Sequence, residues 1–217
     1  MKDNVNGKVT PPSMKGRRRL PSRKSGKNSV DCILQATEEI LVVQDNVETT
    51  TNKIAERAGV NIGTLYQFFE NKEAIFVAVY YRTTSKVGRI LREANVKQLN
   101  EPAEVALPAL VETALQVFEE TSHILFLLAE NTPELRAQKN GTFLANQIYE
   151  GSRSYIERHA ATLSNDDTEI AYYFMQTTVV AVIRSYLLDR PVQIERERFI
   201  KELSRMLINY VNDFLDR

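Results

Sequence analysis

The side chains whose types and spacing best suit recognition chemistry lie in a short predicted helix after residue 60. Helical spacing puts Leu65 with Phe68 or Phe69 on one side of this helix. The other side carries small and hydrogen-bonding residues, namely Ile62, Gly63, Tyr66 and Gln67. Glutamine can form two hydrogen bonds with adenine, and isoleucine can pack on a thymine methyl group. A short helix with these two faces fits the major groove of DNA.

The residues around this helix predict the elements that hold it in place. Ala58-Gly59-Val60 is typical of a tight turn, because Gly59 can adopt the positive φ that ends a helix. Asn61 is a good N-cap for the helix that follows, and Asn71 is a good N-cap for the next one. Residues 50–69 are therefore predicted to form two short helices joined by a tight turn.

A spaced set of residues within about positions 29–81 resembles the DNA-binding signature of the tetracycline-repressor (TetR) family. The matching residues are Thr49-Thr50, Ile54-Ala55, Ala58-Gly59-Val60, Gly63-Thr64-Leu65-Tyr66, Phe69 and Lys72-Glu73. An upstream segment is similar to the first helix of that family, with Ile33-Leu34, Ala36-Thr37 and Ile40-Leu41. An Ala-Gly-Val turn also occurs elsewhere, so the full spaced set carries the resemblance.

The resemblance implies which residues contact DNA. The phosphate contacts would be Thr50, Thr64, Tyr66 and Lys72, and the predicted cap Asn61 can also contact a phosphate. Hydroxyl groups and a lysine at a helix start suit that role chemically. The base-edge contacts would be Ile62, Gly63 and Gln67. The alternatives are that Tyr66 is an ordinary surface tyrosine and that Gln67 makes no base contact.

Charge is unevenly distributed along the 217 residues, although 28 Lys and Arg balance 28 Asp and Glu. Residues 1–30 hold nine basic residues and one acidic residue, a net charge of +8, so the rest carries −8. Residues 1–27 have almost no large apolar side chains, which predicts a disordered basic arm. We expect Arg17, Arg18 and Arg19 to enter a narrow minor groove of DNA. The alternative is an inert tail.

From residue 28 onward the chain is predicted to be almost all helix, without strand-like alternation. Helices are expected at about 28–43, 50–69 (as a pair), 71–94, 102–118, 122–129, 133–161, 165–190 and 192–214. Pro108 is awkward inside one of them and predicts a kink or a later start. The fold class is therefore all-α, with an N-terminal three-helix helix-turn-helix domain and a C-terminal helical domain.

The last two helices favour association with a second copy. Residues 170–188 are apolar nearly all round, so this helix must be buried on both sides. In the TetR family the last helices form the two-fold dimer interface, and the resemblance implies a homodimer here. Two recognition helices about 34 Å apart would read a palindrome in successive major grooves. The alternative is one fully enclosed helix in a monomer.

The resemblance also implies an effector pocket among the middle helices, where a small molecule would shift the spacing of the recognition helices. The candidate ligand contacts are Phe118, His123, Phe126, Tyr149, Tyr173 and Gln176. The aromatic residues among them also fit ordinary core positions. The candidate walls have few charges, which favours an apolar or aromatic effector; Arg184 and His123 are the exceptions.

Other classes of protein find little support in the sequence. His123 and His159 lie far apart without metal-ligand spacing, and no phosphate loop, nucleophile elbow or Cys-His arrangement is present. We therefore expect no catalytic residue, metal or cofactor. The sequence contains no run of about 18 apolar residues, so no membrane span is predicted. The single cysteine, Cys32, fits a reducing cytoplasm and the apolar pattern of the first helix, so it is predicted to be buried.

Together these features predict a cytoplasmic homodimer with a basic arm at 1–27, a helix-turn-helix domain at 28–81 and an effector-binding and dimerisation domain at 82–217. It would bind double-stranded DNA at a palindromic operator and repress transcription until a small apolar or aromatic effector releases it. The alternative is a helix-turn-helix activator or repressor without a small-molecule ligand, controlled by a protein partner or by abundance.

Overall fold

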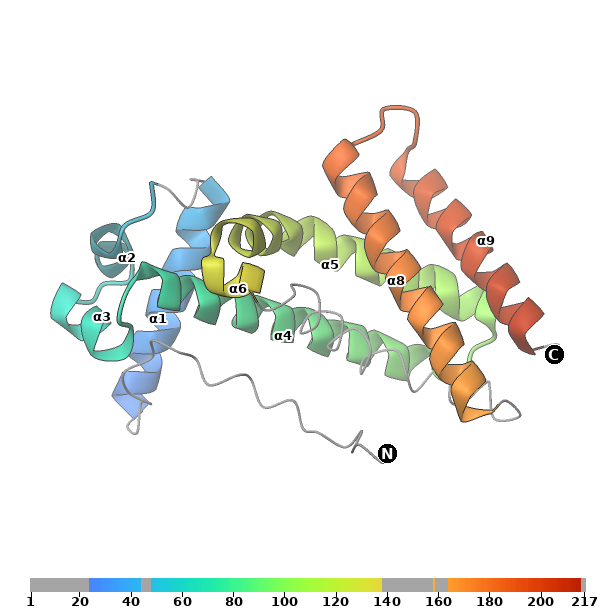
Figure 1. Cartoon of the computed structure of the whole chain (residues 1–217), viewed down its shortest axis with the longest axis horizontal. Helices are drawn as coiled ribbons and strands as arrows, with labels where there is room; N and C mark the ends of the chain where they lie inside the picture. Colours follow the sequence, from blue (N-terminus) through green and yellow to red (C-terminus); the bar gives the residue numbers. More distant parts are fainter. Residues whose placement is uncertain (1–23, 44–47, 138–157, 159–163, 216–217) are drawn as a thin grey trace. The chain divides into compact units, whose positions relative to one another are not determined.

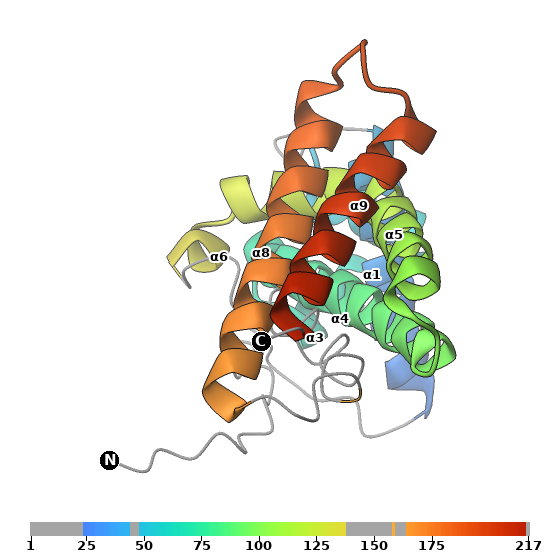
Figure 2. The same ribbon diagram turned by 90° about the vertical axis from the view of Figure 1, so that its right-hand side faces the viewer.

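The computed structural model describes residues 24–43, 48–137, 158 and 164–215. Every regular element in these residues is an α-helix, which confirms the all-α prediction (Figures 1 and 2). The helices are α1 (Lys24–Val43), α2 (Thr51–Arg57), α3 (Ile62–Phe68), α4 (Lys72–Gln98), α5 (Ala103–Asn131), α6 (Pro133–Ala137), α8 (Asn165–Asp189) and α9 (Arg196–Leu215).

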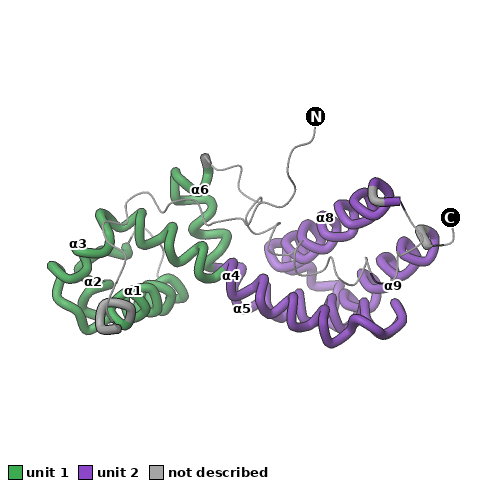
Figure 3. Tube along the Cα trace, turned by 90° about the horizontal axis from the view of Figure 1, so that it is seen from below, with its two compact units in different colours: residues 1–83, 124–140 green, residues 84–123, 141–217 purple. Residues whose placement is uncertain are grey.

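The chain divides into two compact units, coloured separately in Figure 3. The first unit comprises residues 1–83 and 124–140, and the second comprises residues 84–123 and 141–217. Helices α4 and α5 therefore each contribute one part to each unit. The first unit also takes in residues 124–140, which the sequence assigned to the second domain.

The core of the first unit forms where α1, α2 and α3 contact one another. Completely buried side chains there include Ile33, Leu41, Ile54, Leu65, Phe69 and Ile75, and α5 and α6 add Leu125, Leu128 and Leu135 to the buried residues of this unit. Phe68 is also buried, so the predicted apolar side of the short helix at 62–68 does face inward.

Local capping signals set the helix boundaries in this unit. The Thr50 side chain accepts a hydrogen bond from the Lys53 amide at 3.3 Å and caps α2. Asn61 Oδ1 accepts from the Thr64 amide at 2.7 Å and caps α3. Asn71 Oδ1 accepts from the Ala74 amide at 2.8 Å at the start of α4. These bonds satisfy amides that have no partner inside a helix, and they confirm both predicted asparagine caps.

Ion pairs on α1 join it to its neighbours within the first unit. Arg57 of α2 donates to Glu39 at 2.7 Å, and hydrogen bonds from Arg57 and Gln35 lower the pKa of the Glu39 carboxyl. Arg82 of α4 donates to Glu38 at 3.0 Å. Because these pairs are partly or largely exposed, we expect them to fix helix orientation more than they raise stability.

Helix α5 differs from its prediction, because it runs without interruption from Ala103 to Asn131 where two helices were expected. Pro108 lies inside it and removes one hydrogen bond near the exposed start, which a long apolar face can offset. Two polar residues lie near the expected gap between 118 and 122. The Thr121 hydroxyl donates to the Val117 carbonyl at 2.7 Å, and the Ser122 side chain is buried.

Three smaller predictions also change. Cys32 is exposed, because the buried side of α1 is formed by Val30, Ile33, Leu34 and their helical successors. The last helix starts at Arg196 and not at 192, since a turn with a bond from the Ile194 amide to the Pro191 carbonyl precedes it. The long helix expected from 133 is seen only as α6, and the rest of that segment, apart from residue 158, lies outside the described residues.

In the second unit, α8 and α9 lie side by side (Figures 1 and 2). The Tyr186 and Phe199 rings stack with centroids 4.0 Å apart, and Ile183 and Leu203 are buried. At the start of α9, Arg196 donates to Glu119 of α5 at 3.2 Å. These contacts hold α9 against both α8 and α5.

The turn between α2 and α3 gives the first prediction. Gly59 has φ +65°, and no atom lies within 4 Å of the position where a Cβ would be added, so only backbone strain opposes a side chain. We expect Gly59→Ala to lower the free energy of unfolding by about 1 kcal/mol. Gly59→Asn should cost less, because asparagine tolerates this conformation better. Urea denaturation of the full chain measures both. Equal costs for the two variants would contradict strain as the cause.

Candidate functional sites

The exposed side of α3 carries the predicted base-reading residues. Ile62 is 38% exposed and Tyr66 is 40% exposed, while Gly63 and Gln67 are also open to solvent. Leu65 on the opposite side is completely buried. Helix α3 thus has one face fixed in the core and one exposed face, and the exposed face could lie against the bases in a DNA groove.

The N-terminal end of α3 is closely packed around its cap. A Cβ added at Gly63 would lie 3.3 Å from Asn61 Oδ1, which is tighter than most contacts of this kind. Thr64 is half-buried, and its amide donates to the same Asn61 oxygen. Glycine at position 63 therefore leaves room for the Asn61 cap.

Next to α3 lies a polar hollow of about 320 Å³. It is lined by Thr49, Thr50, Thr51, Tyr66, Glu70, Asn71 and Lys72. Three of the predicted phosphate-contacting residues, Thr50, Tyr66 and Lys72, are thus brought together from three separate parts of the sequence. Hydroxyl, amide and ammonium donors gathered in this way suit a phosphate group. The carboxylate of Glu70 opposes that role and would have to point away from an anion.

The hollow also holds two residues that sequence reasoning missed as site residues. The Thr51 hydroxyl lies 3.1 Å from the Tyr66 hydroxyl, so the two share a hydrogen bond that orients the tyrosine. Asn71 uses its side-chain oxygen to cap α4. The missed signal for Thr51 was its place in the run Thr49-Thr50-Thr51 at the start of α2. The predicted contacts Arg17, Arg18 and Arg19 lie outside the described residues.

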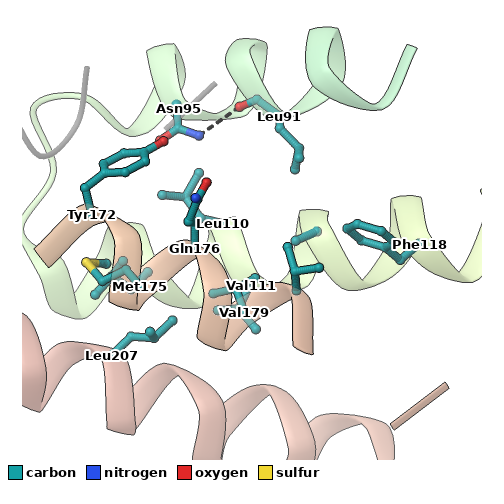
Figure 4. Close-up of a pocket in the computed structure, with 13 residues that line it drawn as sticks. Leu91, Asn95, Leu110, Val111, Phe118, Tyr172, Met175, Gln176, Val179 and Leu207 are labelled. Atoms are coloured by element: carbon teal, nitrogen blue, oxygen red, sulfur yellow. Dashed lines mark hydrogen bonds between the residues drawn. The ribbon is translucent and has the colours of Figure 1, made fainter. Parts of the chain in front are cut away.

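The second unit contains a core cavity of about 80 Å³, shown in Figure 4. Residues of α4, α5, α8 and α9 line it: Leu91, Asn95, Leu107, Leu110, Val111, Ala114, Phe118, Tyr172, Met175, Gln176, Val179, Val180 and Leu207. The walls are mostly aliphatic. No charged side chain occurs among these described lining residues.

The predicted ligand contacts are placed in several different environments. Phe118 and Gln176 line the core cavity. His123 is exposed, Phe126 is half-buried and Tyr173 is 60% exposed, and none of the three lines this cavity. Tyr149 lies outside the described residues. Asn95 lines the cavity but was not predicted as a ligand contact. It lies four residues after Leu91, so helical spacing placed this polar residue on the buried face of α4.

One side of α8 is apolar and exposed, and we call it the outer stripe. Its large residues are Ile170 (51% exposed), Tyr173 (60%), Phe174 (56%) and Leu188 (56%). The Tyr173 and Phe174 rings contact each other edge to face, with centroids 5.8 Å apart. Toward Leu188 this side of α8 also carries the exposed residues Thr177, Ala181, Arg184 and Ser185. The large apolar side chains of the stripe therefore gather mainly at Ile170, Tyr173 and Phe174.

The described residues contain neither a metal site nor a membrane-spanning helix. In the described ranges, no three His, Cys, Asp or Glu side chains are grouped so that they could hold a metal ion. None of the described helices has the length and apolar composition needed to cross a membrane.

Comparison with known proteins places these features in a family. Residues 33–79 match the family of bacterial regulatory proteins named after tetR, and residues 102–210, half of the chain, match the tetracyclin repressor-like C-terminal domain. An uncharacterised helix-turn-helix transcriptional regulator of Mycobacterium tuberculosis is 33% identical over 89 residues, which cover 41% of this chain and 44% of that protein. The match thus spans less than half the length of this relative.

Two further relatives cover more of the chain. The transcriptional repressor KstR2 of Rhodococcus jostii is 24% identical over 144 residues, or 64% of this chain and 70% of the repressor. A crystal structure described as a TetR-family regulator from Mesorhizobium loti superposes with a TM-score of 0.66 at 19% identity, covering 89% of this chain and 98% of the other. The matches in both halves and the shared fold lead to one assignment: the chain belongs to the TetR family of helix-turn-helix transcriptional regulators.

Proposed function

We propose that this regulator is a homodimer that binds a palindromic operator, represses transcription and is released by a small, mostly apolar effector. The observation that carries the DNA-binding part is the exposed face of α3 beside the polar hollow, within one compact unit. Base-reading and phosphate-binding groups there can act on the same stretch of duplex.

In this proposal, Gln67 and Ile62 read base edges while Thr50, Tyr66 and Lys72 hold phosphates. Residues 58–71 contain no Lys or Arg, so α3 contributes little charge of its own. Neutralising phosphates supplies much of the affinity of any DNA-binding protein. The basic arm, with Arg17 to Arg19, is the part of the chain that would supply it.

A pair of substitutions separates base reading from phosphate binding. We expect Gln67→Ala to relax discrimination at one base pair by about 1–3 kcal/mol without changing the salt dependence. Lys72→Ala should weaken binding to all sequences and reduce the salt slope by about 1. Fluorescence anisotropy with the protein's own upstream DNA and with random DNA, at two salt concentrations, measures both effects. Lys97→Ala, at an exposed lysine of the other unit, is the control. Identical behaviour of the two variants would rule out this division of roles.

The basic arm is tested by deletion. Removing residues 1–23 takes away seven Lys and Arg and leaves α1 complete. Because each lost phosphate contact lowers the number of released counterions, the shortened chain should bind operator more weakly and with a flatter salt dependence. A deletion that lowers affinity at every salt concentration by the same factor would show that the arm does not act through phosphates.

The outer stripe of α8 supports the homodimer. It leaves four large apolar side chains at least half exposed on a lone chain, and α9 beside it adds Met206, which is 46% exposed. A group of exposed large apolar side chains such as Ile170, Tyr173 and Phe174 is typical of a protein interface. A two-fold arrangement would place the same patch of two copies face to face, so residues of the stripe would contact their own equivalents.

A charge placed in the stripe tests the dimer. Phe174→Asp should yield monomers at micromolar concentration, because an unpaired carboxylate in an apolar interface is strongly unfavourable. The monomer should also lose affinity for a palindrome while its helix content stays the same. Val96→Asp, at a 67% exposed valine of α4, is the matched control and should remain dimeric. Sedimentation velocity reports the state of both. A dimeric Phe174→Asp would place the interface elsewhere.

A further inference from the structure

We propose that the core cavity of the second unit selects a neutral, mostly apolar molecule that carries one hydroxyl or N–H group, and that Asn95 and Gln176 accept hydrogen bonds from that group. This inference rests on the proposed effector function and adds the chemical class of the effector. Its basis is a pair of buried carbonyl oxygens in a cavity whose other walls are mostly aliphatic, together with the side chains of Phe118 and Tyr172.

Asn95 supplies the first acceptor, and its orientation is fixed. Its side chain is only 3% exposed, and Nδ2 donates to the Leu91 carbonyl at 2.9 Å within α4. A carbonyl oxygen can only accept, so the nitrogen of the amide must face Leu91 and the oxygen must point the other way. Among the described residues, no group donates to that Oδ1 atom, which is fully buried.

Gln176 supplies the second acceptor from a different helix. Its Oε1 atom is also fully buried, and no donor for it occurs in the part of the chain that the structure describes. Both side chains line the same cavity, one from α4 and one from α8, and Figure 4 shows them directed toward each other. Buried carbonyl oxygens are almost always paired, because an unpaired one costs free energy. A hydrogen-bond donor that entered the cavity would remove the free-energy cost of these two unpaired oxygens.

The surroundings of these oxygens limit what the donor can belong to. A charged molecule would lose its hydration here without gaining an opposite charge, since the described lining residues include none. An anion would also face two carbonyl oxygens, which repel it. The aliphatic and aromatic walls, among them Leu107, Val111 and Phe118, suit an apolar body. At about 80 Å³ the cavity is smaller than the roughly 150 Å³ that holds benzene in another protein, so the molecule must be compact and the walls must move apart to admit a single ring.

Three probes that differ only in their polar group test the inference on the full chain. They are 4-ethylphenol, which donates, 4-ethylanisole, which cannot donate, and 4-ethylbenzoate, which is anionic. We expect 4-ethylphenol to bind about tenfold more tightly than 4-ethylanisole by isothermal titration calorimetry. No heat of binding is expected for 4-ethylbenzoate.

Variants assign the preference to the two amides. Asn95→Leu keeps the side-chain volume and removes the acceptor, so it should bring the phenol and the anisole to about equal affinity. Gln176→Met does the same from α8 and serves as the test if Asn95→Leu does not fold. Phe118→Leu is the matched control: it should weaken both probes and leave their ratio unchanged, because it removes apolar contact only.

The outcomes separate this inference from the proposed function. Equal binding of the phenol and the anisole to the unaltered chain overturns the inference. That result is expected if only water bonds to the two carbonyl oxygens. A preference that persists in both Asn95→Leu and Gln176→Met overturns it too, and so does a lack of binding by 4-ethylphenol. Operator binding is measured with and without 4-ethylphenol in parallel. If the phenol is preferred but operator affinity does not change, the inference stands and the effector role fails.

Discussion

The helix-turn-helix depends on a constraint set by the length of its helices. Helices α2 and α3 have seven residues each, well below the about 12 that an isolated helix needs to be even marginally stable in water. They form because Ile54, Leu65 and Phe69 are completely buried in a core shared with α1. Each residue used for that packing is lost to recognition. The face that α3 could offer to DNA is therefore small, so in the proposed function neighbouring parts of the chain would have to add contacts.

The parts of the fold that were predictable from sequence are those fixed by local interactions. Caps at Asn61 and Asn71 and the left-handed Gly59 are determined by residues within three or four positions, so their residue types are sufficient evidence. The continuity of α5 was not predictable in the same way. Pro108 and the polar residues near Thr121 weaken a helix locally, and only burial of the apolar face over its whole length overrides them.

The same distinction explains the sites. The residue types that suit DNA recognition lie on one face of one short helix, so helical spacing alone gathered Ile62, Gly63 and Gln67. The core cavity draws its lining from four helices, and no spacing rule relates Asn95 of α4 to Gln176 of α8. Aromatic residues were reasonable candidates for a pocket, yet Tyr173 faces outward. One position earlier, Tyr172 faces the cavity, because a shift of one residue rotates a side chain by about 100°.

That rotation gives α8 two apolar faces with different uses in the proposed regulator. Tyr172 and Gln176 line the cavity, whereas Tyr173 and Phe174 lie in the outer stripe. A close-packed helix responds to strain by shifting as a unit, so a displacement caused inside the cavity also moves the stripe. A ligand can shift such an equilibrium only by its difference in affinity between the two positions of the helix. An apolar contact tolerates small sliding, but a hydrogen bond weakens steeply with distance and angle. The buried oxygens of Asn95 on α4 and Gln176 on α8 would therefore give an effector hydrogen bonds that depend on direction. The affinity of the effector would then depend on the position of α8.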